Sequence, residues 1–126
     1  MSAAYVDTSF LVAIALDERN ATELARRLTT FERVSASPLL DAELRSTLRR
    51  ESRPVDDALT QRVMWIVPDR SLSVEIDQVL NAGDVRGADC LHLASALYYC
   101  AEPSALTFLT LDSRQRAVAK SLGFKT

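Results

Sequence analysis

Residues 3–13 read AAYVDTSFLVA, a short apolar run that stops at Asp-Thr-Ser and then resumes. The first run is typical of a buried strand, and the second of a helix that begins directly after it. Asp7 therefore stands where the strand ends. One explanation is local, because Asp7, Thr8 or Ser9 can cap the helix by accepting a hydrogen bond from a free backbone N–H.

The rest of the chain alternates in the same way. Residues 20–23 resemble a capping box, and Ser37-Pro38 is a typical helix start. We expect strands at residues 33–36 and 106–110, a brief extended piece at 66–68, and helices at about 20–28, 37–52, 54–65, 72–81, 86–100 and 112–122. This order predicts an α/β fold with a small parallel sheet and helices on both faces. Ligands of such sheets bind beyond the carboxyl ends of the strands.

The composition suits one folded domain over residues 1–126. The chain has 126 residues and 48% of them are hydrophobic, which is enough for a hydrophobic core that needs no disulfide or structural metal. We find no membrane span and no signal peptide, so we expect a cytoplasmic protein with no membrane partner. Cys90 and Cys100 lack a CxxC spacing and are expected to be buried thiols.

The charge pattern limits how nucleic acid could be held. The formal net charge is −2, so the chain is not a basic body that binds nucleic acid through bulk electrostatics. Any such contact must be local. Arginines crowd the first half of the chain, where they form either a solvated helix surface or a site for phosphate or an acidic partner: Arg26, Arg27, Arg33, Arg45, Arg49, Arg50 and Arg53.

Asp7 and Asp112 each follow a predicted strand. A parallel sheet can bring both to the same carboxyl edge, which makes them candidates for one site. Asp112 also has a local explanation, because Gln115 lies three residues later, where the partner in a capping box would be.

Two further acidic residues lie on predicted helices. Asp41 precedes Arg45 by four residues, the spacing of an exposed ion pair, but Glu43 has no such partner. Glu43 borders an apolar stripe, so it either reaches solvent or meets a partner from elsewhere in the fold. Asp89 begins a stripe that faces the core; a pair with Arg86 at the helix start is its local explanation.

Asp7, Glu43, Asp89 and Asp112 together suggest a shared purpose. Carboxylates brought close together repel one another and raise one another's pKa unless a cation lies among them. Mg²⁺ prefers such oxygen ligands, and a site of this kind can activate water and stabilise charge on a phosphate. The chemistry that we expect is phosphodiester hydrolysis.

Four motifs, in order and over nearly the whole chain, carry a resemblance to a known family. They are YVDTSFLVA, Glu43 within SPLLDAELRSTLRR, RGADCLHLASAL and FLTLDSRQRAVAKSLGF. The chain resembles the PIN-domain ribonucleases, specifically the VapC toxins of type II (VapBC) toxin-antitoxin modules. The resemblance implies an endoribonuclease dependent on Mg²⁺, with Mn²⁺ as a substitute, and an RNA substrate. It also implies a homodimer and a cognate VapB-type antitoxin.

The resemblance also implies roles for particular residues. Asp7, Glu43, Asp89 and Asp112 would hold the metal and activate water, with Asp112 acting either directly or through water. Thr8, Ser9 and Arg86 match positions that contact the substrate or orient a carboxylate. His92 occurs in the family motif, but the chemistry does not require it, and we expect a structural role within the helix packing.

Two other classes of function remain open. The first is a PIN-like module that binds RNA or a partner without cutting; the four retained carboxylates speak against it. The second is a phosphotransfer enzyme or receiver domain, which also places aspartates at strand ends. No second aspartate stands two residues after Asp7, as in a haloacid-dehalogenase-type phosphatase, and no lysine directly follows a strand late in the chain to contact a phosphoryl group.

Overall fold

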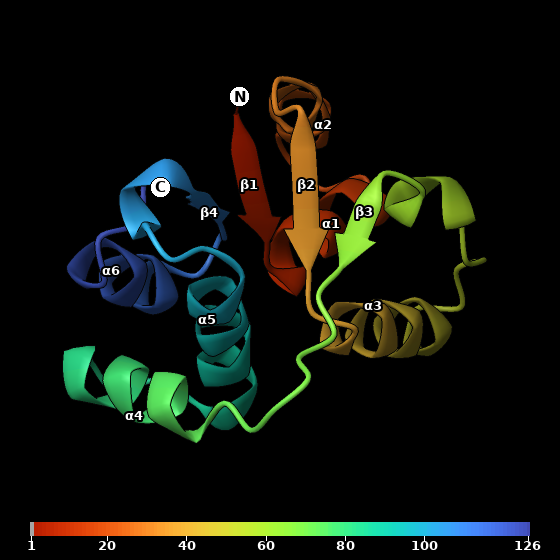
Figure 1. The fold of residues 1–126 in the computed structure, drawn as a ribbon. Helices are drawn as coiled ribbons and strands as arrows, with labels where there is room; N and C mark the ends of the chain where they lie inside the picture. The colour runs from red at the N-terminus through yellow and green to blue at the C-terminus, as the bar shows by residue number, and fades with distance from the viewer. Residues whose placement is uncertain (1) are drawn as a thin grey trace.

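A computed structural model describes residues 2–126; Met1, the first residue of the predicted domain, lies outside the described residues. Four parallel strands form one sheet in the order β3-β2-β1-β4. The strands are β1 (Ala3–Val6), β2 (Arg33–Ala36), β3 (Val63–Trp65) and β4 (Thr107–Leu109). In Figure 1 the arrows of β1, β2 and β3 point the same way, downward, and α3 begins below the tip of β2. The predicted α/β class is thereby confirmed.

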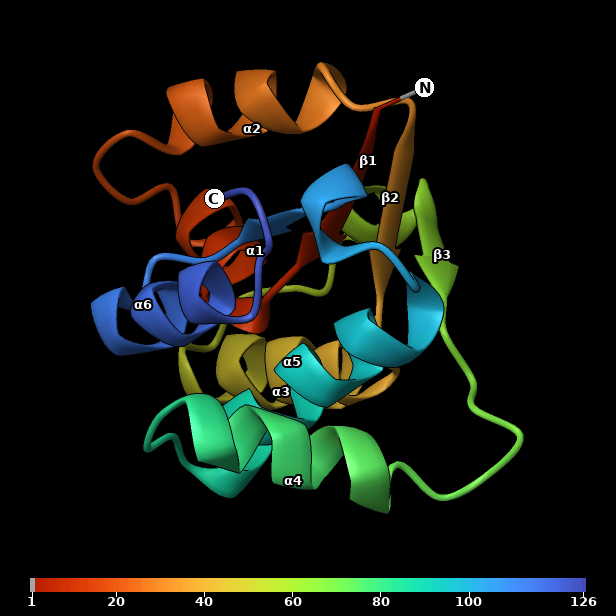
Figure 2. The same cartoon turned by 60° about the vertical axis from the view of Figure 1, so that its left-hand side comes forward.

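Helices cover both faces of the sheet (Figures 1 and 2). The helices are α1 (Thr8–Ala15), α2 (Ala21–Thr29), α3 (Leu39–Arg50), α4 (Ser73–Ala82), α5 (Gly87–Tyr99) and α6 (Ser113–Ser121), with 3-10 turns η1 (Asp57–Thr60) and η2 (Pro103–Ala105). Right-handed crossovers between parallel strands require this arrangement, because each connection must return over the sheet.

Each face of the sheet has its own apolar core, because side chains alternate along β1. Tyr5 points to one face, where α4, α5 and α6 contribute Val79, Leu93 and Val118. Ala4 and Val6 point to the other face, where α1 and α3 contribute Phe10, Leu11 and a stripe of leucines. α1, α3 and α6 follow β1, β2 and β4 within a few residues and so begin at the carboxyl edge of the sheet, and the start of α5 lies beside Gln115 of α6.

The predicted helix over residues 54–65 is wrong. Residues 54–56 are irregular, η1 is a single turn capped by Asp56, whose Oδ1 accepts from the N–H of Ala58 at 3.0 Å, and residues 63–65 form β3. Val63 and Trp65 are residue types that favour strands, and they pair with Val34 and Ala36. The pairing with β2 outweighs the local helical pattern, and the extended piece lies three residues earlier than expected.

The predicted capping box at residues 20–23 is also wrong, although the helix that follows is present. Asn20 adopts the left-handed region, with φ +72°, and its side chain makes no cap hydrogen bond. The Ser37-Pro38 start is confirmed, because Oγ of Ser37 accepts from the N–H of Leu39 at 3.1 Å. Within residues 2–126, no helix is both long enough and apolar enough to cross a membrane.

Candidate functional site

Asp7 lies directly after β1 and has two roles at once. Its Oδ2 accepts hydrogen bonds from the N–H of Ser9 at 3.1 Å and from Oγ of Ser9 at 2.7 Å, which caps α1. Its Oδ1 accepts from Nε2 of Gln115 at 3.2 Å. Asp7 is only 3% exposed. The cap and the site are therefore not alternatives, because each is served by a different oxygen of one buried carboxylate.

Thr110, at the end of the neighbouring strand, and Gln115, in α6, both contact Asp7, with Oγ1 of Thr110 3.4 Å from Oδ2 of Asp7. The register pairs Val6 with Leu109, so Asp7 and Thr110 follow adjacent strands at the same level. Oγ1 of Thr110 donates to Oε1 of Gln115 at 2.6 Å and accepts from the N–H of Asp112 at 3.1 Å. The sequence argument did not identify Thr110, although its place at a strand end, like that of Asp7, was a usable signal.

Gln115 forms only half of the predicted capping box. Its backbone N–H donates to Oδ1 of Asp112 at 2.9 Å, as the box requires. Its side chain is fully buried and extends to Asp7 instead of returning to Asp112; it also donates to the carbonyl of Asp89 at 3.4 Å. One amide therefore links α6 to the ends of β1 and α5.

Glu43 faces the same edge from α3. Its Oε1 accepts from Oγ1 of Thr8 at 2.7 Å and lies 2.9 Å from Nε2 of His92. The hydrogen bond from His92 is the main reason that the pKa of the Glu43 carboxyl falls below its ordinary value; Thr8 lowers it further, while partial burial acts in the opposite direction. Of the two possibilities left open for Glu43, solvent or a partner from elsewhere in the fold, the structure shows partners, Thr8 and His92.

His92 lies inside the site. It is 1% exposed, its Nε2 is 3.6 Å from Oδ1 of Asp7, and its Nδ1 is 2.7 Å from the hydroxyl of Tyr5. The expected structural role within the helix packing stays a prediction, and the partners of His92 come from β1, α1 and α3. Helical spacing alone cannot reveal such partners.

The protons around His92 follow from the groups that it contacts. An ionised carboxylate only accepts hydrogen bonds, so Nε2 carries a proton toward Glu43. In the neutral imidazole, Nδ1 then accepts from the Tyr5 hydroxyl, which itself accepts from the N–H of Ser37 at 3.0 Å. Burial raises the pKa of the Tyr5 phenol far above its ordinary value, so the phenol keeps the proton that it donates. Tyr5 and His92 thus orient Glu43.

Asp89 lies in the first turn of α5 and is half-buried. Burial raises the pKa of its carboxyl, and the negative charges of Asp7 and Asp112 raise it further. Glu43 adds to this effect. The structure thereby brings all four predicted carboxylates within electrostatic reach of one another.

Asp112 and Arg86 are exposed at helix starts. Asp112 is the N-cap of α6, and Arg86 is the N-cap position of α5. The expected local pair of Arg86 with Asp89 does not form: among residues 2–126, the Asp89 carboxylate has no ion pair and no hydrogen-bond donor. Thr8 and Ser9 use their hydroxyls to bond Glu43 and Asp7.

The donor set suits a hard divalent cation. Four carboxylates face one edge, and within the described chain no lysine or arginine pairs with any of them. Such uncompensated charge favours a cation with oxygen ligands. Their side chains are not yet gathered, however: across residues 2–126, no three carboxylate, imidazole or thiol groups stand close enough to hold one ion. Ion binding thus requires side-chain rotation, which the unbonded Asp89 allows, whereas Asp112 would give up its cap bond to the N–H of Gln115.

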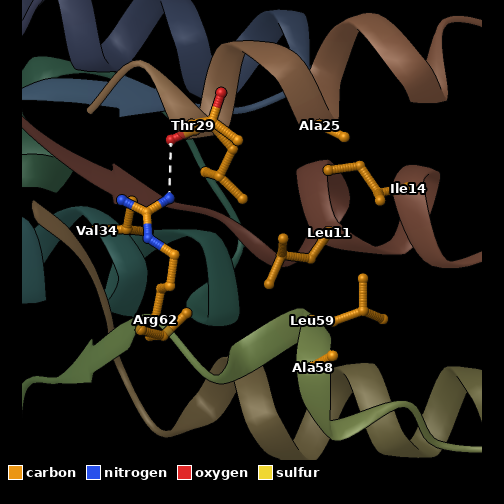
Figure 3. Close-up of a pocket in the computed structure, with 10 residues that line it drawn as sticks. Leu11, Ile14, Ala25, Thr29, Val34, Ala58, Leu59 and Arg62 are labelled. Atoms are coloured by element: carbon orange, nitrogen blue, oxygen red, sulfur yellow. Dashed lines mark hydrogen bonds between the residues drawn. The ribbon is translucent and has the colours of Figure 1, made fainter. Parts of the chain in front are cut away.

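An apolar pocket lies elsewhere, between α1, α2 and β3. Figure 3 shows Leu11, Ile14, Ala25 and Leu59 around it, with Arg62 at one side. Nη1 of Arg62 donates to the carbonyl of Leu28 at 3.5 Å. None of the four carboxylates lines this pocket. We therefore take the edge of the sheet, and not this pocket, as the functional site.

Comparisons with known proteins identify a family. The family model described as the PIN domain matches residues 4–121. A search of curated proteins and a search of solved structures gave no significant match. The matched range includes every residue of the carboxylate site.

Proposed function

Because the chain belongs to the PIN-domain family, we propose that it is a metal-dependent endoribonuclease that hydrolyses phosphodiester bonds of RNA. PIN domains are generally metal-dependent nucleases, and PIN nucleases bind RNA. The observation that carries the proposal is geometric: His92 lies 2.9 Å from Glu43 and 3.6 Å from Asp7, and Gln115 bonds Asp7, the carbonyl of Asp89 and the Asp112 cap. Burial, and then the charges of its acidic neighbours, raise the pKa of the Asp89 carboxyl. Such a site is costly unless it binds a cation.

We assign the metal to Asp7, Glu43, Asp89 and Asp112, with Mg²⁺ as the ion and Mn²⁺ as a substitute. A divalent ion held there acts as a Lewis acid toward the phosphate and lowers the pKa of water, so that a nucleophile is available at neutral pH. The neighbouring side chains hold the carboxylates in position. Ser9 and Gln115 hold Asp7, while Thr8 and His92 hold Glu43.

The hydrogen bonds that hold Asp7 and Glu43 are already formed before substrate binds. Asp7 and the network around it are buried, so the orienting groups do not reorganise at the moment of reaction. Among residues 2–126 the Asp89 carboxylate has no hydrogen bond to lose, so it would turn toward a bound ion, while Asp112 would hold the ion directly or through water. Arg86, exposed beside Asp89, is our candidate for contact with a substrate phosphate; the hydroxyls of Thr8 and Ser9 contribute by fixing the carboxylates.

We further propose that the protein is the VapC-type toxin of a toxin-antitoxin pair, a homodimer inhibited by a VapB-type antitoxin. The support is the ordered set of four motifs, and PIN domains are commonly toxin-antitoxin related. Induced expression should arrest growth of a bacterial host, and co-expression of the antitoxin should restore it. Arrest that persists in Asp7→Asn would contradict a toxic activity at this site.

The decisive experiment is cleavage of total RNA by purified protein with Mg²⁺, with Mn²⁺ and with EDTA. Discrete fragments should appear only with metal. Asp7→Asn and Glu43→Gln should each lower the rate by more than the 10–100-fold typical of losing a ligand's supporting hydrogen bond. Asn also caps helices well, so Asp7→Asn should remain folded.

Asp41→Asn is the matched control for Glu43→Gln, because both residues lie in α3. Asp41 pairs with Arg45 at 2.8 Å on the exposed side of α3, so its loss should leave cleavage unchanged and alter stability by no more than about 0.5 kcal/mol. Full activity in Asp7→Asn would refute the assignment. Folded wild-type protein that binds RNA without metal-dependent cleavage would favour the non-cutting binding module.

A further inference from the structure

A shallow groove leads away from Glu43 along α3. It is lined by Ala42, Glu43, Ser46, Thr47 and Arg50. Positions 43, 46, 47 and 50 have the spacing of one helix face. The groove therefore connects a carboxylate of the proposed active site, at one end, with a guanidinium at the other.

The guanidinium of Arg50 is held in place by neutral groups. Nη1 donates to Oγ of Ser46 at 3.0 Å, and Nη2 donates to Oγ1 of Thr47 at 3.3 Å. Within residues 2–126, Arg50 forms no ion pair. Arg45 on the same helix, by contrast, is neutralised by Asp41 and Asp57 at 2.8 and 2.9 Å. Arg50 thus offers an oriented charge that the protein does not itself compensate.

Another explanation for Arg50 is the helix dipole, which favours a cation in the last turn of α3. The dipole accounts for a positive residue at this position. The contacts with Ser46 and Thr47 follow the usual direction of helical side chains, which lean toward the N-terminus of their helix. Neither feature provides the Arg50 charge with an acidic partner, and the side chain is directed along the groove toward Glu43.

Charge indicates the ligand. The net charge of the chain is −2 and the active site is a cluster of carboxylates, so an RNA backbone approaches only where a local cation offsets repulsion. Resting on the proposed ribonuclease function, we infer that Arg50, held by Ser46 and Thr47, binds a backbone phosphate of the RNA strand whose scissile bond lies at the carboxylates. Seven residues of helix place this phosphate subsite about 10 Å along α3 from Glu43.

Such a contact positions the strand without reading its sequence. Arg50→Gln should therefore weaken binding of labelled single-stranded RNA regardless of sequence. Measured by fluorescence anisotropy in EDTA, the slope of log Kobs against log salt should become shallower by about 0.7, the value for one phosphate contact on a single strand. With Mg²⁺, KM should rise while kcat stays unchanged.

Two control variants separate this contact from general effects of charge. Arg33→Gln removes the same charge at the start of β2, at the opposite end of the strands, and should keep the wild-type slope. Arg50→Lys keeps the charge but loses the planar fork, so its slope should also match wild type while its affinity falls modestly. Gln, Lys and Arg are all good helix formers, so α3 should persist in both Arg50 variants.

The outcomes distinguish this inference from the proposed function. If Arg50→Gln kept the salt slope and the KM of wild type, and wild type cleaved RNA, the phosphate subsite would be wrong and the proposed nuclease activity would remain supported. A shallower slope together with no cleavage by wild type would keep the subsite and overturn the nuclease. Unchanged RNA binding but weakened binding of a polyglutamate peptide in Arg50→Gln would overturn the subsite in favour of an acidic protein partner.

Discussion

At the scale of single residues, the site depends on buried neutral groups that hold carboxylates. Gln115 has no exposed surface, donates to Asp7 and to the carbonyl of Asp89, and accepts from Thr110. An amide can satisfy these partners without adding a charge. A cationic side chain in its place would offset the negative charge of the carboxylates that attracts a metal ion. An apolar side chain would leave buried polar atoms without hydrogen-bond partners.

Gln115→Met tests this support, because methionine has similar length and no hydrogen bonds to offer. We expect the free energy of unfolding to fall by about 1–3 kcal/mol, the cost of buried polar groups left unpaired. Metal-dependent cleavage should fall by about 10–100-fold, because Asp7 loses its orienting partner. Urea unfolding and RNA cleavage measure the two effects. Gln61→Met, at an exposed position, is the control; equal behaviour of the two variants would contradict the role.

At the scale of elements, α4 packs against α6, the helix that Asp112 caps and that carries Gln115. Gly83 ends α4 in an extended conformation open to any residue. A Cβ atom at Gly83 would nevertheless lie 2.6 Å from Cγ2 of Val118 in α6. Valine in a helix has one strongly preferred rotamer, so this contact is not easily relieved.

Gly83→Ala should therefore push α4 and α6 apart and lower the free energy of unfolding by about 1–3 kcal/mol, the usual cost of overpacking. The loss should be clearly smaller when Val118 is already replaced by alanine. A double-mutant cycle of Gly83→Ala with Val118→Ala, followed by urea unfolding, measures this coupling. Additive effects would mean that the helices do not meet through these two residues.

At the scale of the whole molecule, the four carboxylates couple stability to pH and to metal. The pKa of the Asp89 carboxyl is raised by burial, and then by the charges of Asp7 and Asp112. Between the ordinary value of an unfolded aspartate, about 3.9, and this raised pKa, the folded chain binds more protons than the unfolded chain. Stability attributable to Asp89 therefore falls as pH rises through this window, and the cost persists at neutral pH.

Asp89→Asn should remove that cost. In EDTA at neutral pH the variant should be more stable than wild type, and the difference should vanish below the unfolded pKa. Mg²⁺ should stabilise wild type by mass action and the variant less, because a ligand is lost. Urea unfolding at both pH values, with and without Mg²⁺, gives the comparison. The control is Asp77→Asn on the exposed side of α4, which Mg²⁺ should stabilise as much as it stabilises wild type. If Mg²⁺ stabilised Asp89→Asn by the same amount as wild type, Asp89 would not be a metal ligand.

Most of the sheet was predictable: β1 and β4 lie in short apolar runs that end at polar residues, and β2 lies directly before the helix start at Ser37-Pro38. β3 was not, since only its pairing with β2 separates residues 63–65 from the helical pattern before them. The four carboxylates could be selected as a group because each follows a strand or lies near the start of a helix without a compensating charge. That they bind metal and act in catalysis remains a prediction.

The sequence by itself determined the parallel alternation, and with it the edge at which Asp7 and Asp112 lie, because periodicity and helix starts are local properties of the chain. Only the tertiary structure decided what holds the carboxylates. Tyr5 contacts His92 across 87 residues of chain, and Gln115 contacts Asp7 across 108. Local patterns are silent about such pairs, since a helical residue with a polar side chain has the same spacing whether it faces solvent, the core or a site.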